Sequence, residues 1–546
     1  MNRNGLRGVA SALISLLGVT AGFAAGTVEV ASQVDPSQIS DTGSGTLPSD
    51  PFDPLPIPPS LSADGRYAVF LSAMTNLVPG QQEGNGGPQE PGRDVFLADL
   101  TAGTVTLVSH AMSSPATTGN KGSLEAVLSA DGRWVAFISS ATDLVPGQAG
   151  NPYYPDSDVL LFDRVSGATT LVASTREDLS GFENLSISAD GRYVVFESDA
   201  SDIIPGQQGE RGGNNVFLYD RVERTTRLVS HVSGSPTTGG GGSQRGISAD
   251  GRFILLAGGA NLSPGLPATT ALVLYDRVAD TLAPVGSAPT AVLSADGKIV
   301  AYVGGTSLYF YARETGVTTQ VEVSGTTTAG SSSPPLSLSA DGHFAAFLLS
   351  DPPGGYGARL AVCDRISRTT VMEGRPVPQY GPSIDAFRIS ADGRLVVFAA
   401  SAADAVPGQV DANTEDDVFV FDRTTGRTSL VSGAGGSPLT TGNGASGSPV
   451  LSANGARAVF WSRAADLVAG LKDLNGTADL FAYDVAAKSA QAVTRRAADL
   501  PSLSPALGGE AGDLSADGRL VAFVSASSHL VPGQVDTNGK EDVFLY

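Results

Sequence analysis

Short apolar runs separated by turn-forming residues recur along the whole chain. Two runs at 123–128 and 134–139 flank a turn, a third at 158–163 follows a long loop, and a fourth at 169–172 follows another turn. These runs are rich in β-branched and aromatic residues, and no long stretch places apolar residues at helical spacing. The pattern predicts a unit of four short antiparallel strands, named A to D in chain order.

The turn between strands A and B keeps nearly the same sequence in every unit. Asp-Gly suits a tight turn because Gly takes a positive φ without steric cost, and the Asp carboxylate can accept backbone N–H groups. Nine copies spaced 45 to 67 residues apart predict a repeat architecture. The turn reads Ser-Ala-Asp-Gly-Arg at 62–66, 129–133, 188–192, 248–252, 390–394 and 515–519, with the variants SADGK at 294–298, SADGH at 339–343 and SANGA at 452–456.

Four-stranded units of this length are the blades of a β-propeller. A parallel β-helix would need much shorter repeats, and separate β-sandwiches would need about seven strands each. We therefore predict an all-β fold, a single closed propeller of about nine blades, with an eight-bladed ring and one displaced repeat as the alternative. The propeller is expected over 56–546, with blades at about 56–111, 123–175, 182–232, 243–286, 289–324, 334–374, 384–433, 447–495 and 511–546.

The repeat resembles a known propeller family. The pattern S-A-D-G-R-x-V-x-F, followed by D-V-F-L-x-D and T-x-L-V-S, is similar to the TolB-type repeat, whose turn usually reads S-P-D-G-K/R. The resemblance extends from about residue 58 to residue 546. It implies a propeller with repeats like those of WD-repeat proteins. Ala in place of Pro and a long L-V-P-G-Q loop are departures from that plain repeat, and they leave open whether the chain shares that family's partner role.

The N-terminus has the features of an export signal. Arg3 and Arg7 precede an uncharged, mostly apolar stretch over 8–25 that ends in small residues. This predicts a signal peptide over 1–25, removed after Ala24 or Ala25, and a periplasmic or secreted protein. An uncleaved membrane anchor is the alternative, although the apolar run is barely long enough to span a bilayer.

The segment after the predicted cleavage site looks like a strand D. Residues 26–32 match 103–109, whereas the last repeat contains strand C at 542–546 and no strand D after it. We expect 26–33 to complete the last blade and to cover its open edge. Residues 34–55 are then a connector rich in Pro, Ser and Gly.

The charge balance limits the possible partners. The chain has 55 Asp and Glu against 34 Lys and Arg, a net charge of −21. An acidic surface argues against nucleic acid and against anionic membranes. The single cysteine, Cys363, excludes an internal disulfide, and its place in an apolar run predicts a buried side chain.

Three loops between strands B and C have one oxygen-ligand spacing, D-x-N-x-x-x-D. Calcium takes several oxygen ligands, so this pattern predicts weak calcium sites in the last three repeats. The alternative is that Asp and Asn only form turns and that the third Asp begins strand C. The candidate ligands are Asp411, Asn413, Asp417, Asp473, Asn475, Asp479, Asp536, Asn538 and Asp542.

Catalytic patterns are scarce in this sequence. It has no G-x-S-x-G motif and no zinc spacing, and its four histidines lie in unlike repeat contexts. Asp-Arg pairs that end strand C, as at 163–164 and 220–221, recur from blade to blade and are expected to be structural. We therefore predict a monomeric, non-enzymatic scaffold that binds a protein or a glycan on the face of the B–C loops and the D–A links between blades. The alternative is a glycan lyase or hydrolase, in which carboxylates from different blades would converge in the central funnel.

Overall fold

The computed structural model describes most of the chain. The described residues are 58–85, 92–146, 148, 157–175, 181–208, 213–258, 262, 271–304, 307–322, 336–350, 358–372, 387–471, 478–494, 510–514, 521–525 and 542–545. Their regular structure is almost entirely β, with one short 3₁₀ helix at Ala434–Gly436. The chain divides into two units, residues 40–496 and residues 1–39 with 497–546, and each is described by itself.

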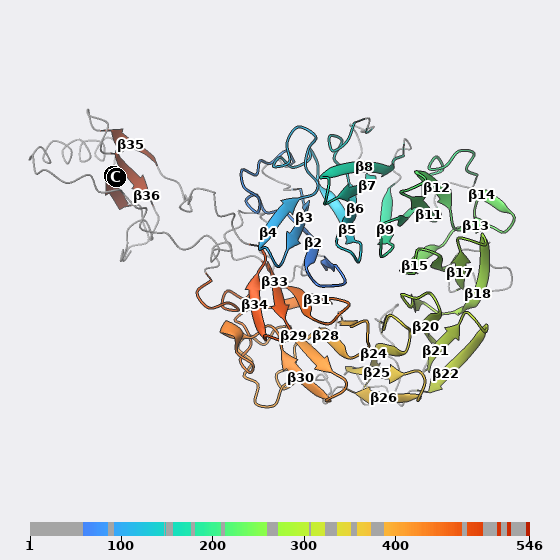
Figure 1. Ribbon diagram of the computed structural model, residues 1–546. Helices are drawn as coiled ribbons and strands as arrows, with labels where there is room; N and C mark the ends of the chain where they lie inside the picture. The colour runs from blue at the N-terminus through green and yellow to red at the C-terminus, as the bar shows by residue number, and fades with distance from the viewer. Residues whose placement is uncertain are drawn as a thin grey trace, which may run out of the picture. The chain divides into compact units, whose positions relative to one another are not determined.

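The larger unit is a β-propeller of eight four-stranded antiparallel blades arranged in a ring (Figure 1). The first four blades are β1 (Ser60–Leu61), β2 (Tyr67–Ser72), β3 (Asp94–Asp99) and β4 (Thr104–Leu107); β5 (Ser123–Leu128), β6 (Trp134–Ser139), β7 (Asp158–Asp163) and β8 (Ala168–Ala173); β9 (Phe182–Ile187), β10 (Tyr193–Ser198), β11 (Asn215–Asp220) and β12 (Thr225–Leu228); and β15 (Ser243–Ile247), β16 (Phe253–Ala257), β17 (Ala271–Asp276) and β18 (Thr281–Ser287). A two-stranded hairpin of β13 (His231–Val232) and β14 (Ser235–Gly239) lies between blades 3 and 4 in sequence.

The other four blades follow in chain order. They are β19 (Thr290–Leu293), β20 (Ile299–Gly304), β21 (Ser307–Ala312) and β22 (Val317–Glu322); β23 (Leu336–Leu338), β24 (Phe344–Ser350), β25 (Ala358–Asp364) and β26 (Thr369–Met372); β27 (Phe387–Ile389), β28 (Leu395–Ala400), β29 (Asp417–Asp422) and β30 (Arg427–Leu430); and β31 (Ser446–Leu451), β32 (Arg457–Ser462), β33 (Asp479–Asp484) and β34 (Ser489–Ala492). Strands B and C are almost fully buried, and the core is a series of apolar clusters between neighbouring blades.

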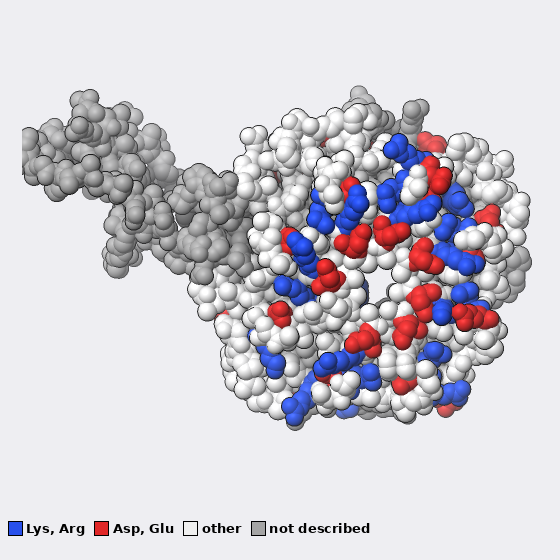
Figure 2. Space-filling view, viewed as in Figure 1, with Lys and Arg blue, Asp and Glu red and all other residues white. Residues whose placement is uncertain are grey.

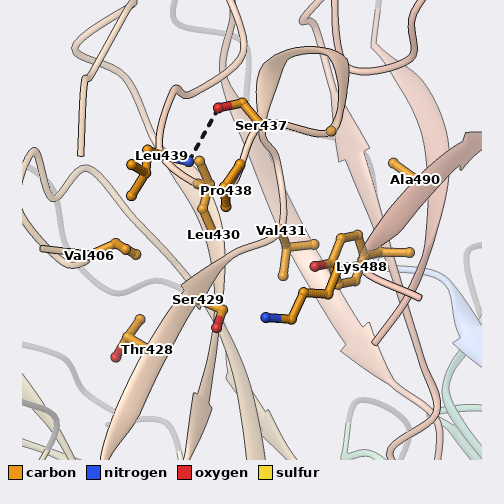
Figure 3. A pocket seen from close by; sticks show the side chains of 12 residues that line it. Val406, Thr428, Ser429, Leu430, Val431, Ser437, Pro438, Leu439, Lys488 and Ala490 are labelled. Carbon is orange, nitrogen blue, oxygen red and sulfur yellow. Dashed lines mark hydrogen bonds between the residues drawn. The ribbon is translucent and has the colours of Figure 1, made fainter. Parts of the chain in front are cut away.

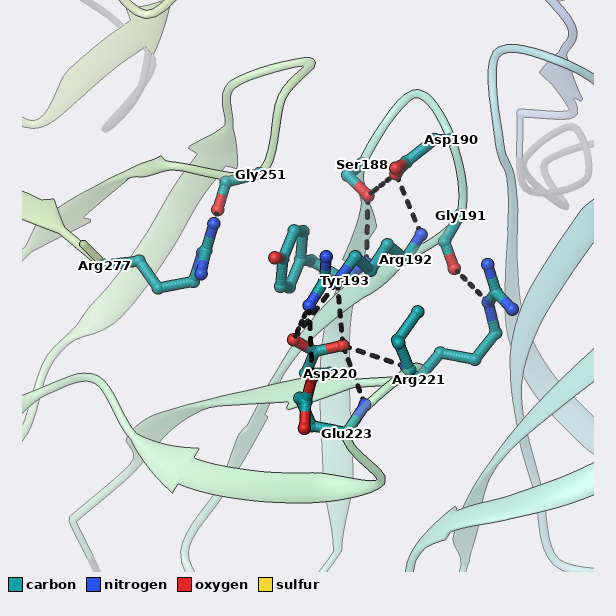
Figure 4. Close-up of polar contacts among 11 residues, drawn as sticks. Ser188, Asp190, Gly191, Arg192, Tyr193, Asp220, Arg221, Glu223, Gly251 and Arg277 are labelled. Carbon is teal, nitrogen blue, oxygen red and sulfur yellow. Dashed lines mark hydrogen bonds and ion pairs between the residues drawn. The ribbon is translucent and has the colours of Figure 1, made fainter.

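The repeated turn is held by its own side chains, as blade 3 shows (Figure 4). Ser188 Oγ donates to Asp190 Oδ1 over 2.7 Å and accepts the Tyr193 N–H over 2.9 Å. Asp190 Oδ1 also accepts the Arg192 N–H over 2.9 Å. The Arg192 guanidinium then forms a two-pronged contact with Asp220, at the end of strand C, at 2.9 and 3.0 Å. The turn and the Asp-Arg pair are therefore structural, as predicted.

Neighbouring blades are joined by the second member of that Asp-Arg pair. Arg277 of blade 4 lies over the Tyr193 ring of blade 3, 4.0 Å from its centroid, and donates through Nε to Gly251 O over 3.0 Å. The same stacking joins blades 2 to 1, 3 to 2, 5 to 4 and 7 to 6. Gly251 has a φ of +68°, and a Cβ at this position would overlap the Tyr193 ring. Both the backbone conformation and the close approach therefore require glycine here.

The eight turns are also linked to one another by backbone hydrogen bonds. Each turn donates an N–H to the carbonyl of the next alanine, and the eighth turn donates from Asn454 to Ala63 O over 3.1 Å. In five of the eight links the donor is the alanine N–H, for example Ala189 to Ala249 O at 2.9 Å. Proline has no N–H, so a proline in place of alanine could not donate these five hydrogen bonds.

The first blade packs directly on the eighth. The Phe70 and Trp461 rings meet edge to face, with centroids 6.1 Å apart, in one apolar cluster formed by both blades. Gln491 Nε2 donates to Leu100 O over 3.0 Å near this junction. No gap is left between these blades for another one.

The ninth repeat forms a sheet of its own in the smaller unit. Its described strands are β35 (Glu510–Leu514), β36 (Val521–Ser525) and β37 (Asp542–Leu545), paired in that order. The all-β propeller prediction is thus confirmed, but the ring has eight blades and not about nine, because blades 1 and 8 already contact each other. The strand predicted over 26–33, the signal peptide over 1–25 and the connector over 34–55 lie outside the described residues.

Two smaller observations bear on the sequence predictions. Cys363 lies in β25 with none of its surface exposed, and burial raises the pKa of its thiol to about 11, so it is a core residue and not a reactive thiol. Among the residues that the structure describes, no helix has the length and apolar character needed to cross a membrane.

Candidate ligand-binding site

On the face formed by the A–B and C–D turns, five arginines of the repeated turn are paired with an aspartate at the end of strand C. Figure 2 shows this face, with acidic side chains gathered around the central opening and basic side chains lying outside them. The pairs join Arg of the repeated turn to Asp at the end of strand C, as in Arg133 and Asp163 at 2.9 Å. That hydrogen bond lowers the pKa of Asp163 to about 2, so the carboxylate is charged at any ordinary pH. The arginine and aspartate of each such pair are therefore engaged with one another within the fold.

The first predicted calcium loop forms a turn through its own side chains. Asp411 Oδ1 accepts the N–H of Asn413 over 3.1 Å and that of Thr414 over 2.8 Å. Asn413 donates through Nδ2 to Gly442 O over 2.7 Å and accepts the Glu415 N–H over 2.7 Å. This is the Asx-turn alternative that the sequence had left open.

The third aspartate of the pattern begins strand C and is buried. Ser432 Oγ donates to Asp417 Oδ1 over 2.8 Å and accepts the Val418 N–H over 3.0 Å, and Thr494 donates to Asp479 in the same way over 2.9 Å. Burial raises the pKa of Asp417 to about 7, and nearby acidic groups add to the shift. Each of these carboxylates therefore accepts a hydrogen bond from a neighbouring hydroxyl at the first residue of strand C.

The structure tests only part of the predicted calcium sites. Asp473, Asn475, Asp536 and Asn538 lie outside the described residues, and Asp542 is the first residue of β37. Within the described ranges, no group of three or more histidine, cysteine, aspartate or glutamate side chains is placed to hold a metal ion. Calcium binding at these loops stays a prediction.

A different polar cluster lies at the inner edge of blades 2 to 4. Figure 1 shows β5, β9 and β15, the A strands of these blades, closest to the centre of the ring. The starts of A strands lie on the face of the B–C loops, opposite the repeated turns, because connections alternate between faces in an antiparallel blade. We call this set the inner-mouth cluster; it consists of Glu125, Glu183, Asn184, Glu197, Gln244 and Arg245.

Irregular strand pairing directs these side chains. The register of β9 on β10 shifts between Val195 and Glu197, and that of β15 on β16 shifts between Gln244 and Gly246. Asn184, in the irregular part of β9, has a φ of +54°. Bulges of this kind turn side chains away from their usual faces and occur often beside functional sites.

Glu197 is the buried centre of the inner-mouth cluster. Its side chain has no exposed surface, and its Oε1 accepts the Asn184 amide over 2.9 Å and the Gln244 N–H over 2.8 Å. Its Oε2 has no hydrogen-bond partner among the described residues. Burial raises the pKa of Glu197 to about 7; the charge of Glu183 raises it further, and Arg245 opposes the shift.

The other members connect three blades around Glu197. Glu125 of blade 2 accepts the Leu185 N–H of blade 3 over 2.9 Å, and Gln244 of blade 4 donates through Nε2 to Asn184 O over 3.0 Å. Burial raises the pKa of the Glu125 carboxyl, and the charge of Glu183 adds to this shift. Glu183 itself is exposed and accepts a hydrogen bond from the Asn214 amide.

The sequence predictions did not include this cluster, although a signal for it existed. The position of Glu197 in strand B is apolar in the other blades, for example Leu71, Ile138 and Trp461. A single glutamate in that register is out of place in a core strand. Comparison of the aligned repeats would have singled it out.

The structure also has a pocket of about 150 Å³ between blades 7 and 8 (Figure 3). It is lined by β30, by residues 436–439 and by the β33–β34 hairpin, and Lys488 extends towards Ser429. Its walls are mostly apolar, and it is smaller than the usual pocket for a small molecule. Among the residues that line it, only Lys488 is charged.

Comparison with known proteins shows likeness in fold only. No protein-family model matches the sequence, and no curated protein matches it. Among solved structures, TolB from Acinetobacter baumannii matches at 16% identity, with 53% of this chain and 60% of that chain covered and a TM-score of 0.29. Dipeptidyl peptidase 4 from Porphyromonas gingivalis matches at 12% identity, with 86% of this chain and 64% of that chain covered and a TM-score of 0.48.

A third similar structure is an oligogalacturonate lyase in complex with manganese. It matches at 11% identity, with 78% of this chain and 87% of that chain covered and a TM-score of 0.38. The present chain spans less than two thirds of the length of the TolB and dipeptidyl peptidase chains. These proteins include a peptidase and a lyase, and at such low identity the likeness gives no information on activity or ligand.

Proposed function

We propose that this protein is a non-enzymatic binding scaffold whose ligand engages the inner-mouth cluster of blades 2 to 4. The observation behind this proposal is the fully buried carboxylate of Glu197, whose second oxygen has no partner among the described residues. A buried, incompletely paired carboxylate costs stability, so a functional reason for keeping it is expected. The cluster lies on the face of the long B–C loops, and loops held by a rigid scaffold are where binding residues concentrate.

A propeller enzyme is the second candidate, and one observation favours it. Carboxylates from different blades do converge, since Glu125 comes from blade 2 and Glu183 and Glu197 come from blade 3. A general acid must, however, reach its substrate within hydrogen-bond distance. The group with a pKa of about 7, Glu197, has no exposed surface and does not meet this requirement, whereas Glu183 is exposed and can contact a bound ligand.

The proposal includes the cellular location predicted from the sequence. The basic and apolar stretch over 1–25 supports export to the periplasm or the outside of the cell. A ligand found there would be a protein or a glycan, in agreement with the acidic net charge, which disfavours nucleic acid.

Array binding with matched variants tests this function. Peptide and glycan arrays would be probed with the full chain, with Glu183→Lys at the inner mouth and with Glu223→Lys on the turn face; both glutamates are exposed, and both changes alter the net charge equally. Binding that is lost only in Glu183→Lys is the expected result. Binding that survives in Glu183→Lys but fails in Glu223→Lys, or cleavage of an arrayed glycan, would contradict the proposal.

A further inference from the structure

The inner-mouth cluster has an unbalanced charge that points to the class of its ligand. Resting on the proposed function, we propose that the cluster binds a basic side chain, lysine or arginine, presented by a protein partner. Glu183 and Glu125 would accept the cationic group at the surface, above the buried carboxylate of Glu197. The partner is therefore a protein with an exposed basic residue and not a neutral glycan.

The first argument is the local charge count. The cluster has three carboxylates, Glu125, Glu183 and Glu197, and one guanidinium, Arg245. Glu183 is the direct cross-strand partner of Glu197, and its charge acts unfavourably on both Glu125 and Glu197. A cation placed among them would relieve this repulsion.

The second argument is independent of charge and comes from hydrogen bonding. Both partners of Glu197, Asn184 and Gln244, belong to the cluster, so its Oε1 is hydrogen-bonded within the cluster. Its Oε2 lacks a donor among the described residues although its side chain is completely buried. Buried carboxylate oxygens normally have donors, so the missing donor leaves this carboxylate under-stabilised, and a cation bound at the surface above it would stabilise it through space.

The third argument concerns which cation fits. No metal-holding group of three acids or histidines occurs in the described part of the chain, and the acids of the cluster are partly engaged by backbone N–H groups of β9 and β15. A lysine or arginine side chain needs only one or two carboxylate contacts, at hydrogen-bond distance, and this matches exposed Glu183 beside half-buried Glu125. An organic cation therefore suits the site better than a metal ion.

The arrangement also predicts how binding depends on pH. The charged groups that act on Glu197 are Glu183 of β9 and Arg245 of β15. A bound cation favours the ionised form of Glu197, so binding should release a proton when the pH is near 7. Affinity should then rise with pH as Glu197 becomes ionised.

Titration calorimetry with a tetralysine peptide tests the proposal. The full chain would be titrated at about 0.15 M salt, where exposed charges are screened beyond about 8 Å, with tetra(acetyl-lysine) as the uncharged probe. Glu183→Gln and Glu125→Gln are each expected to weaken tetralysine binding about tenfold, equivalent to 1.4 kcal/mol. Glu223→Gln, on the turn face of blade 3, changes the net charge equally and should bind as the unchanged protein does. Melting curves would show that each variant is folded.

The possible outcomes distinguish an error in the ligand class from an error in the location of the site. Binding of tetralysine that Glu223→Gln weakens as much as Glu183→Gln would mean nonspecific attraction to an acidic protein and would overturn the inference. Failure of tetralysine to bind, with a glycan that binds to the unchanged protein and not to Glu183→Gln, would also overturn it, while leaving the proposed function intact. If every probe binds Glu183→Gln as it binds the unchanged protein, both this inference and the proposed function are overturned.

Discussion

Glu197→Gln should remove a pH-dependent loss of stability. Burial raises the pKa of Glu197 from 4.5 to about 7, so the folded protein holds this proton more tightly than the unfolded chain does. The associated stability is fully present below pH 4.5 and is lost as the pH rises through 7. A shift of about 2.5 units corresponds to about 3 kcal/mol of unfolding free energy, of which about 2.5 kcal/mol is lost between about pH 5 and about pH 9.

Glutamine suits this position sterically. Its oxygen can accept the same hydrogen bonds from Asn184 and Gln244, and its NH₂ group replaces the oxygen that has no partner among the described residues. Because glutamine does not titrate, the unfolding free energy of the variant lacks the pH dependence that Glu197 causes. Its stability relative to the unchanged protein should therefore rise by about 2.5 kcal/mol between about pH 5 and about pH 9.

Urea unfolding followed by tryptophan fluorescence measures this difference. Both tryptophans, Trp134 and Trp461, lie in the ring and report on it directly. Glu223→Gln, at an exposed glutamate on the turn face, is the matched control and should follow the unchanged protein at every pH. A Glu197→Gln variant whose stability changes with pH in parallel with the unchanged protein would refute the assignment of a buried, high-pKa carboxyl to Glu197.

Three further predictions concern the ring and the calcium loops. Gly191→Ala should lower the unfolding free energy more than Gly206→Ala in urea titrations, because both glycines have positive φ but only a Cβ at 191 would overlap the Trp134 ring; equal losses would mean that the close approach is unimportant. Ala189→Pro should lower the unfolding free energy by about 1 kcal/mol more than Ala130→Pro does, because it removes the N–H that donates to Ala249 O. Ala130→Pro removes no such donor, since the turn of blade 2 donates through the Asp131 N–H. Melting temperatures that fall equally in the two variants would disprove the role of that bond. Millimolar calcium should raise the melting temperature through preferential binding to the folded state. A triple variant with Asp411→Ala, Asp473→Ala and Asp536→Ala should abolish this rise, whereas the control Asp143→Ala should not. If calorimetry gives the same melting temperature in calcium and in chelator, these loops are turns and do not bind calcium.

The fold was readable from the sequence because its signals are local. The repeated turn at 188–192 uses only side chains within five residues of one another, so its sequence alone determines its geometry. The apolar runs on either side give strand length and pairing directly. The number of blades was not readable, because it depends on whether Phe70 meets Trp461 across almost the whole chain. Local sequence does not contain that information.

The candidate site was not predicted for a related reason. Asp417 has the spacing of a metal ligand, but its burial beneath Ser432 comes from the start of strand C, which a spacing rule does not reveal. Glu197, by contrast, belongs to no motif, and its importance comes from contacts with Asn184 of one strand and Gln244 of another blade. Such a site is assembled by the ring, and only its unusual residue type in strand B is visible in the sequence.

Hydrogen–deuterium exchange of the full chain with and without tetralysine tests the central claim that ligand binding occurs at the inner mouth and that the turn face is structural. The account predicts slower exchange on binding over 181–187 and 243–247, where the Leu185 and Gln244 N–H groups bond to the carboxylates of the cluster. The repeated turns, for example 188–192, should exchange at the same rate in both states. Protection confined to those turns or to the pocket around 428–439, with none in β9 and β15, would contradict it.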